Sequence, residues 1–365
     1  MLQNHVRSLR LQNHLSQTEL AVAASVTRQT IAAIEMAQVA PSITVALRLA
    51  RILGVAVEEL FQETISSSTE VAHLGPDEPV APGERVTLGR IGDRWIAHAA
   101  TEMLGQRMQP SVAHGVVLTC NGSSVARIQR NPSGAQDPAV FIAGCDIGLG
   151  LLAEHARSGS GTTETIWHNA DNRAALTRLS QGLVHMAAIH GDTKIAVQAQ
   201  ATSLLSTLQG YRQIQFARWE IGWLVKRGNP AHFETAADLA SGHLRIVNRA
   251  TGAGARRVLD TLLQEAHVAS GMVSGYGTEV AGHLQVADAI VSGHADVGIG
   301  ISSAAAIARL DFIPIQEETC TLLVPDTVAH DDGVKRVLSL LQSDRFRWDL
   351  ARFGPYDVTA TGAFI

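Results

Sequence analysis

Apolar residues in the first sixty positions recur at helical spacing and are separated by short capping signals. Val6 and Leu9 fall on one face of a first helix. Ser16 and Glu19 form a capping box, whose two side chains satisfy free backbone amides at the start of a short second helix. Thr27 caps the third helix, and helices are predicted over residues 28–36, 43–53 and 57–61. Short helices joined by a tight turn predict an all-α helix-turn-helix unit.

From about residue 138 onward, apolar runs of strand length alternate with amphipathic helices. This alternation predicts α/β layers around a parallel sheet. Two uninterrupted β-like stretches, near residues 214–228 and 311–325, break the pattern and enclose one complete α/β unit. A chain that leaves one lobe, builds a second and returns by another long strand is typical of hinged binding proteins. The predicted fold is therefore multidomain, with an all-α head and a two-lobed α/β domain.

The middle of the chain has a weaker pattern. Residues 62–83 mix Ser, Pro, Gly and acidic side chains without periodicity, which predicts a linker. Short alternating stretches between turn signals follow, and they predict a small β-rich connector. The expected domains are a helix-turn-helix domain at 1–63, a linker at 64–83, the connector at 84–137 and the two-lobed domain at 138–365.

Composition supports a soluble multidomain protein. The chain has 365 residues, of which 46% are hydrophobic and 17% charged, enough for two or three cored domains. No apolar run approaches the length of a membrane span, and the first residues do not resemble a signal peptide. Three widely spaced cysteines without a CxxC argue against a disulfide scaffold or a zinc site and favour a cytoplasmic location. The net charge of −5 argues against binding of nucleic acid by the whole protein surface but allows a small DNA-reading module.

The run from Leu15 to Phe61 resembles the Cro/phage-repressor class of DNA-binding domains along its whole length. Ser25, in the turn, and Ala37, after the recognition helix, stand where that family usually has glycine. Ser25 is therefore expected in a left-handed conformation, at a cost of about 1 kcal/mol. The residues that fall on the family pattern are Leu20, Ala21, Val26, Thr27, Ile31, Ile34, Glu35, Pro41, Leu49, Ala50, Leu53, Gly54, Val55, Leu60 and Phe61.

The resemblance implies that the recognition helix enters the major groove of an operator. Arg28 then contacts guanine or a phosphate, and Gln29 pairs with adenine. Gln17 resembles the phosphate contact of the family. The remaining candidates along this helix are Thr27, Thr30, Ala32 and Ala33, the two alanines as contacts to thymine methyl groups. A unit that mediates only protein contacts is the alternative.

The charge of this head limits its affinity for DNA. Residues 1–61 contain five arginines and four glutamates, a formal charge of +1. Few phosphates are neutralised by one copy, so a homodimer or higher homo-oligomer on a two-fold operator is expected.

Residues 138–362 resemble the periplasmic-binding-protein-like (type II) domain, related to molybdate-binding proteins, that occurs fused behind helix-turn-helix modules. The matching segments include AGCDIGLGLLAEHA, ARWEIGWLVKRGNP, ADLASGHLRIVNRATGAGARRVLD and SGYGTEVAGHLQVADAIVSGHADVGIGI. The resemblance implies a domain that binds a small anionic effector, with molybdate or tungstate as the expected ligand. Without an export signal, intracellular sensing is expected in place of uptake.

The loop ATGAGARR is the strongest candidate for an anion site. Gly252 and Gly254 allow a close backbone approach, Thr251 offers a hydroxyl, and Arg256 lies in the first helical turn. A tight strand-to-helix turn with a surface arginine is the alternative. Further candidates, at the mouths of other strands or near the first crossing, are Asn172, Arg173, Arg218, Trp219, Arg249, Tyr276 and Thr278.

Two carboxylates complicate a simple oxyanion site. Asp146 follows the first predicted strand of this domain, and Glu279 follows Tyr276, Gly277 and Thr278. Both are expected near the cleft, where either would repel a fully ionised oxyanion. They would suit a mixed-charge organic ligand, although we favour an ordinary helix N-cap for Asp146. Cys145 and His190 either ligate a metal or pack at strand ends, and the absence of a close-spaced ligand set favours packing.

Together these features predict a ligand-responsive, DNA-binding transcriptional regulator and not an enzyme. The sequence contains no GxSxG, Walker loop, or evident nucleophile and base at a recognisable spacing. Besides molybdate or tungstate, the effector alternative is a phosphate-bearing or pterin-like organic anion. An enzyme and a transport-type binding protein with a degenerate DNA domain are weaker hypotheses. No membrane partner, resident cofactor or metal is expected.

Overall fold

The computed structural model consists of two compact units, Met1–Ser68 and Thr69–Ile365. It describes residues 2–63, 68–75, 80–104, 107–122, 124–131, 137–158, 163–192, 201–202, 204–206 and 208–365. Within these residues no helix is both long enough and apolar enough to cross a membrane.

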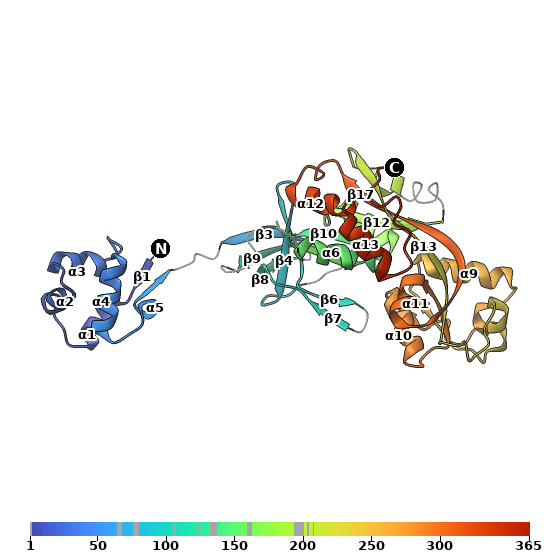
Figure 1. Cartoon of the computed structure of the whole chain (residues 1–365), viewed down its shortest axis with the longest axis horizontal. Helices are drawn as coiled ribbons and strands as arrows, with labels where there is room; N and C mark the ends of the chain where they lie inside the picture. The colour runs from blue at the N-terminus through green and yellow to red at the C-terminus, as the bar shows by residue number, and fades with distance from the viewer. Residues whose placement is uncertain are drawn as a thin grey trace. The chain divides into compact units, whose positions relative to one another are not determined.

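The first unit is a small helical domain (Figure 1). Its elements are β1 (Leu2–Asn4), α1 (Val6–Gln12), α2 (Gln17–Ala24), α3 (Arg28–Glu35), α4 (Ile43–Leu53), α5 (Val57–Leu60) and β2 (Phe61–Glu63). The strands β1 and β2 pair antiparallel. The predicted capping box of Ser16 and Glu19 is confirmed, and Thr27 caps α3 by accepting a bond from the Thr30 amide. The core between the helices contains the fully buried Leu20, Ile31 and Leu49.

The second unit begins with a closed five-stranded barrel in the order β3-β5-β4-β8-β9. Its strands are β3 (Thr69–Leu74), β4 (Arg85–Ile91), β5 (Arg94–Ala99), β8 (Gly115–Asn121) and β9 (Val125–Arg130). The strands β6 (Thr101–Leu104) and β7 (Arg107–Pro110) form a separate hairpin. The linker prediction was wrong for residues 69–74, because β3 pairs with both β5 and β9; residues 64–67 and 76–79 lie outside the described residues.

One mixed sheet of eight strands organises the rest of the unit, in the order β11-β10-β12-β17-β13-β16-β14-β15. Its strands are β10 (Val140–Gly144), β11 (Thr165–Asn169), β12 (Met186–Gly191), β13 (Tyr211–Val225), β14 (Ile246–Arg249), β15 (Glu279–Val280), β16 (Val297–Ile301) and β17 (Asp311–Pro325). We call the parallel strands β10–β12 the core of the first lobe and β14–β16 that of the second. The long strands β13 and β17 pair antiparallel along their length and belong to both lobes.

Helices cover both lobes (Figure 1). The first lobe carries α6 (Gly148–Ser158), α7 (Asn172–Ser180), α12 (Asp332–Leu341) and α13 (Asp344–Phe353). The second carries η1 (Ala236–Ser241), α9 (Gly254–Glu265), η2 (Ser270–Met272), α10 (His283–Val291) and α11 (Ser302–Ala308). Strand β10 explains why the sheet needs helices on both faces, since Val140 and Ile142 face one core and Phe141 and Ala143 the other.

The barrel is bonded to the first lobe through backbone and histidine contacts. The Ala139 amide donates to the Leu88 carbonyl over 2.8 Å. The His185 ring joins the two parts, because its Nδ1 accepts from the Phe141 amide at 3.0 Å and its Nε2 lies 3.0 Å from the Arg90 carbonyl oxygen. This pattern requires a neutral ring with its proton on Nε2, and burial lowers the pKa of His185 to about 4.

Candidate functional site

Five buried ionisable side chains come together where the two lobes meet. Cys145 follows β10, His190 lies near the end of β12, Arg249 ends β14, His283 begins α10 and Glu318 lies in β17. Each is 5% exposed or less. We call these five residues the interlobe cluster. Because buried charges are costly unless they are paired, the partners of each side chain indicate what the cluster can do.

The His190 ring links a thiol to a carboxylate. Its Nε2 lies 3.0 Å from the Cys145 Sγ, and its Nδ1 lies 2.5 Å from a Glu318 carboxylate oxygen. Burial opposes protonation of this ring, but Cys145 and Glu318 outweigh it and raise the pKa of His190 well above its ordinary value. The Asn172 side chain fixes the His190 backbone, donating to its carbonyl at 2.7 Å and accepting from its amide at 3.2 Å.

Arg249 brings a buried cation to the same place. One of its terminal nitrogens donates to the Ala281 carbonyl at 2.8 Å. Its Nε is buried and has no hydrogen-bond partner among the described residues. Burial lowers the pKa of Arg249, while Cys145 and Asp171 act in the opposite direction. Arg249 therefore has a donor left to offer.

Other buried donors and acceptors nearby are also unsatisfied. His283 Nδ1, the Ser302 Oγ and the Trp219 indole nitrogen have no hydrogen-bond partner within the described part of the chain. Burial, Arg249 and His190 all lower the pKa of His283, so this ring is neutral. The Trp219 ring lies 5.7 Å from the His190 ring between centroids. Buried polar groups without partners are uncommon in folded proteins, and a bound ion or ligand is one of their ordinary explanations.

Two helices of the second lobe begin at this cluster without a side-chain cap. The first residue of α9, Gly254, lies against the His190 ring, since a Cβ added there would be 3.1 Å from His190 Cε1. The N-cap positions of α9 and α10, Ala253 and Gly282, contribute no side-chain hydrogen bond. Free backbone amides and the positive end of the helix dipole both favour an anion.

Asp146 forms a second buried polar group beside the cluster. It accepts a bond from the Gly148 amide at 2.7 Å, as a residue capping α6 would. Its two carboxylate oxygens each lie 3.2 Å from the Tyr356 hydroxyl, which is 3.1 Å from the Ser303 Oγ. Burial raises the pKa of Asp146 to about 7. This group therefore connects the start of α6 to the start of α11 through Tyr356.

The strongest sequence candidate, the loop before α9, has its side chains satisfied elsewhere. Arg256 donates to Glu279 at 3.0 Å and lies over the Tyr276 ring, 4.2 Å from its centroid. Thr251 also donates to Glu279, at 3.5 Å. Gly252 has a φ of +100°, which explains the glycine at this turn. The loop thus forms an ion-paired network around a half-buried Arg256, with Glu279 and Thr278 exposed beside it.

Two further candidates point elsewhere. Arg218 forms ion pairs with Glu317 and Asp357, and Arg173 is exposed on the first turn of α7. The structure instead adds Glu318, His283, Ser302 and Tyr356, which sequence reasoning missed. A histidine directly after Gly282, at a helix start, was the only local signal among them. Cys145 and His190 bond to each other, and no group of three or more His, Cys, Asp and Glu side chains in the described residues is arranged to hold a metal.

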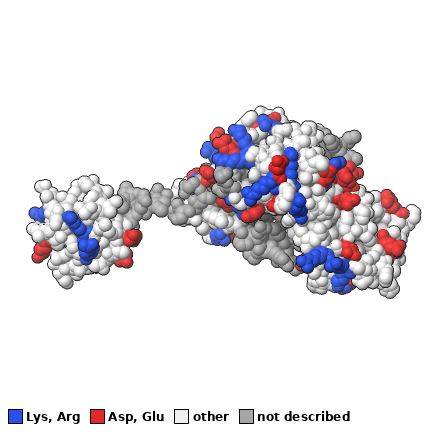
Figure 2. Space-filling model, viewed as in Figure 1, with Lys and Arg blue, Asp and Glu red and all other residues white. Residues whose placement is uncertain are grey.

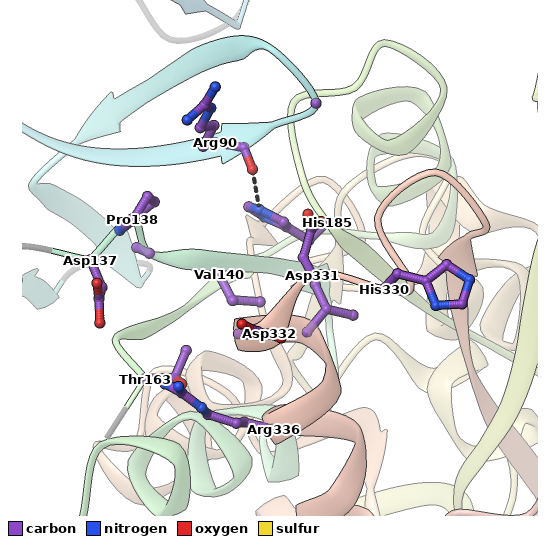
Figure 3. A pocket seen from close by; sticks show the side chains of 14 residues that line it. Arg90, Asp137, Pro138, Val140, Thr163, His185, His330, Asp331, Asp332 and Arg336 are labelled. Carbon is purple, nitrogen blue, oxygen red and sulfur yellow. Dashed lines mark hydrogen bonds between the residues drawn. The ribbon is translucent and has the colours of Figure 1, made fainter. Parts of the chain in front are cut away.

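A separate pocket of about 530 Å³ lies between the barrel and the first lobe (Figure 3). Arg90 and Arg336 line it together with Asp137, Asp331 and Asp332. Its charges are mixed, and none of the interlobe cluster lines it. We therefore base the ligand site on the buried cluster and not on this pocket.

The helix-turn-helix unit presents its expected reading residues in different ways. Thr27, Arg28 and Gln29 are exposed at the start of α3, whereas Thr30, Ala32 and Ala33 are half-buried. The Gln17 amide donates to the Glu35 carboxylate at 2.9 Å, and Glu35 also pairs with the buried Arg10. On the face of this unit seen in Figure 2, basic and acidic side chains both occur and no extended basic surface is present.

Family models match both parts of the chain. A model described as the PBP superfamily domain matches residues 153–342, more than half of the chain. A helix-turn-helix model matches residues 6–60.

The chain also resembles individual proteins, at 30% sequence identity or less. The chain is 30% identical over 230 residues to the uncharacterized protein YvgK of Bacillus subtilis (strain 168), covering 62% of this chain and 74% of that protein. A phosphate-bound substrate-binding protein assigned to a phosphate ABC transporter of Clostridium perfringens shares 11% identity at a TM-score of 0.46, covering 59% of this chain and 98% of that one. The substrate-binding domain assigned to a molybdenum ABC transporter of Clostridium difficile shares 12% identity with this chain at a TM-score of 0.40. The match covers 60% of this chain and 98% of that one. At this level of similarity the two solved structures do not bear on the choice of ligand. By its family model and its relative, the chain belongs to the PBP superfamily and carries a Cro/phage-repressor-class helix-turn-helix domain at its N-terminal end.

Proposed function

We propose that this protein is a transcriptional regulator that binds an operator through its helix-turn-helix unit and a small anion at the interlobe cluster. Its two families are a DNA-binding class and a binding-protein class, and neither is catalytic. Work on DNA implies a cytoplasmic location. The formal charge of +1 on residues 1–61 implies that a homodimer is needed for useful affinity.

The ligand proposal rests on Arg249, a buried cation with a donor that no group in the described residues uses. Its guanidinium is buried and retains an unpartnered Nε. Two uncapped helices begin beside it, at Gly254 and His283. A cation, two sets of free amides and neutral hydrogen-bonding groups together suit a compact ligand with several acceptor oxygens.

The carboxylates near the cluster do not oppose an anion, because each has a partner. Glu318 is paired with His190, and Glu279 is paired with Arg256. Asp146, whose pKa is about 7, is partly protonated near neutral pH. Molybdate or tungstate is therefore our proposed effector class. A phosphate-bearing or pterin-like organic anion is the second candidate. The unpartnered indole N–H of Trp219 favours it, because a larger ligand has further acceptors beyond those that bind Arg249.

Thermal unfolding of the full chain tests this site. Molybdate, tungstate, sulfate, phosphate and organic phosphates are compared, and the true ligand class at a hundred times its dissociation constant should stabilise the fold by about 2.7 kcal/mol. Arg249→Met, which removes the buried cation but keeps an unbranched side chain, should abolish that shift.

Arg256→Met tests the competing loop, because Arg256 is neutralised by Glu279 and Asp260 and bonds to Arg249 at its backbone carbonyl, at 3.2 Å. It should keep the response. If Arg256→Met loses the thermal shift and Arg249→Met retains it, the ligand binds at the loop before α9 and the interlobe site is wrong.

A further inference from the structure

The anion proposal leaves the alignment of Cys145, His190 and Glu318 unused. A thiol, an imidazole and a carboxylate lie in series, with 3.0 Å between Sγ and Nε2 and 2.5 Å between Nδ1 and the carboxylate oxygen. The carboxylate oxygen beside Nδ1 orients the ring, and Nε2 lies within reach of the thiol proton, where it can act as a base. This is the arrangement of an activated cysteine nucleophile. Membership of the PBP superfamily does not by itself explain this arrangement.

The other cysteines provide a comparison within the same chain. Cys320 is as deeply buried as Cys145, but burial and the neighbouring Asp146, Cys145 and Glu318 raise the pKa of its thiol well above the ordinary value. Cys120 is half-buried in the barrel and donates to the Val80 carbonyl at 3.1 Å. Among the three, Cys145 has the imidazole partner.

The surroundings of Cys145 select the charge of its reaction partner. Cys145 belongs to the same buried cluster as Arg249, whose Nε has no hydrogen-bond partner among the described residues. The uncapped start of α9 lies against the His190 ring, near Cε1. A reagent that carries a carboxylate would place its negative charge at Arg249 while its electrophilic carbon meets the sulfur.

We propose that Cys145 is a nucleophile that forms a thioether with small carboxylates bearing an electrophilic carbon. The sulfur lone pair attacks that carbon, the C–S bond forms, and the bond to the leaving group breaks with its electron pair. His190 retains the proton that came from the thiol, and Glu318 holds the charged ring. Nothing is oxidised or reduced.

Iodoacetate and iodoacetamide test the inference on the native full chain, since they differ in charge but hardly in size. Adducts are quantified at each cysteine by peptide mass spectrometry over time. Because His190 is placed to take the proton of Cys145, whereas burial raises the pKa of the Cys320 thiol, Cys145 should react about tenfold faster than Cys320 with iodoacetate. The ratio of iodoacetate rate to iodoacetamide rate should be higher at Cys145 than at Cys120.

Variants assign the effect to the named groups. Arg249→Met should lower the iodoacetate-to-iodoacetamide ratio at Cys145, whereas Arg227→Met, at an exposed position of the second lobe, should leave it unchanged. Glu318→Gln should slow both reagents at Cys145. If Glu318→Gln does not fold, the wild-type ratios still decide. Equal ratios at Cys145 and Cys120, or a Cys145 that reacts only after unfolding, overturn the inference.

This inference goes beyond the proposed function and does not depend on it. Thiol reactivity without any stabilisation by oxyanions would leave the nucleophile standing and remove the anion proposal. Stabilisation by oxyanions with an inert native Cys145 would do the reverse.

Discussion

At the scale of single residues, Asp146 shows how burial decides the behaviour of an ionisable group. Its ordinary pKa of 3.8 rises to about 7, with burial as the main cause, although Gly148 and Tyr356 bond to the charged form. Between these two pH values the folded protein holds a proton that the unfolded chain has released. This carboxyl therefore makes the fold less stable as pH rises from about 4 to about 7, and adds no further change above that.

Asp146→Asn should remove this dependence. The amide oxygen still accepts from the Gly148 amide, and its nitrogen can donate to the Tyr356 hydroxyl. At pH 8 the variant should be more stable than the wild type by about 2 to 4 kcal/mol, with little difference at pH 4. Urea unfolding across this range measures both. Parallel stability curves for the two proteins would contradict the assignment.

Ser25 and Ala37 test the cost of the two departures from the repressor pattern. Both have positive φ, 56° and 57°, so the predicted left-handed Ser25 is confirmed and Ala37 shares its conformation. Ala37→Gly should stabilise the first unit by up to about 1 kcal/mol. Ala23→Gly, an exposed position inside α2, should destabilise it by about 1 kcal/mol and serves as the control. The melting transition of the helical unit is the measurement, and equal effects of both glycines would contradict the strain argument.

Single residues also show which features of the structure could be predicted from the sequence. Positions whose role depends on near neighbours were predicted correctly, such as the Ser16 capping box, the Thr27 cap and the turn at Ser25. Glu318 was not predicted, because it meets His190 through the pairing of β12 with β17, 128 positions along the chain. Arg249 and Arg256 look alike in sequence; burial distinguishes them, and burial depends on the packed second lobe.

At the scale of elements, the attachment of the barrel to the first lobe depends on a neutral His185. Alternation of strands and helices predicted the lobes well. It failed at β3, whose six residues lie within a Ser- and Pro-rich stretch and whose pairing partners lie farther along the chain. The barrel closure is therefore a long-range property, and so is the histidine contact that accompanies it.

Acid should weaken this attachment. The ordinary pKa of 6.5 falls to about 4 in His185, so the unfolded chain takes up a proton that the folded protein refuses. The contribution of the neutral ring is complete above pH 6.5 and is lost as pH falls toward 4. His185→Asn keeps an acceptor for the Phe141 amide but not the bond to Arg90.

The variant should be less stable than the wild type at pH 7 by about 1 to 3 kcal/mol. Its stability should also fall less steeply between pH 6.5 and 4. Asp146 acts in the opposite direction over part of this range, so the two variants are compared separately and together. A wild-type slope that persists in His185→Asn would assign the acid sensitivity to another group.

At the scale of the whole molecule, our proposal requires the two units to be coupled. Coupling exists only if the ligand prefers one of the arrangements available to the DNA-bound protein. An operator selected from random duplexes with the full chain allows a direct measurement at fixed salt. The effector found by thermal unfolding should then change operator affinity.

Two variants should separate the functions. Arg28→Ala should weaken operator binding about tenfold or more, by loss of a base or phosphate contact, while the thermal response to the effector is retained. Arg249→Met should bind the operator normally and lose the effect of the ligand. An effector that leaves operator affinity unchanged in the wild type would show that the units act independently.

The pairing of the long strands has one more consequence. Val225 and Asp311 are opposite each other in the register of β13 and β17, so the chain between them departs and returns at neighbouring points. Topologically, that stretch is an insertion into a hairpin. Replacing it with a tight turn would close the hairpin without moving either strand. The shortened chain would keep Cys145, His190 and Glu318 and would lose Arg249 and His283, so the cation of the site lies on a stretch that can be removed without the thiol.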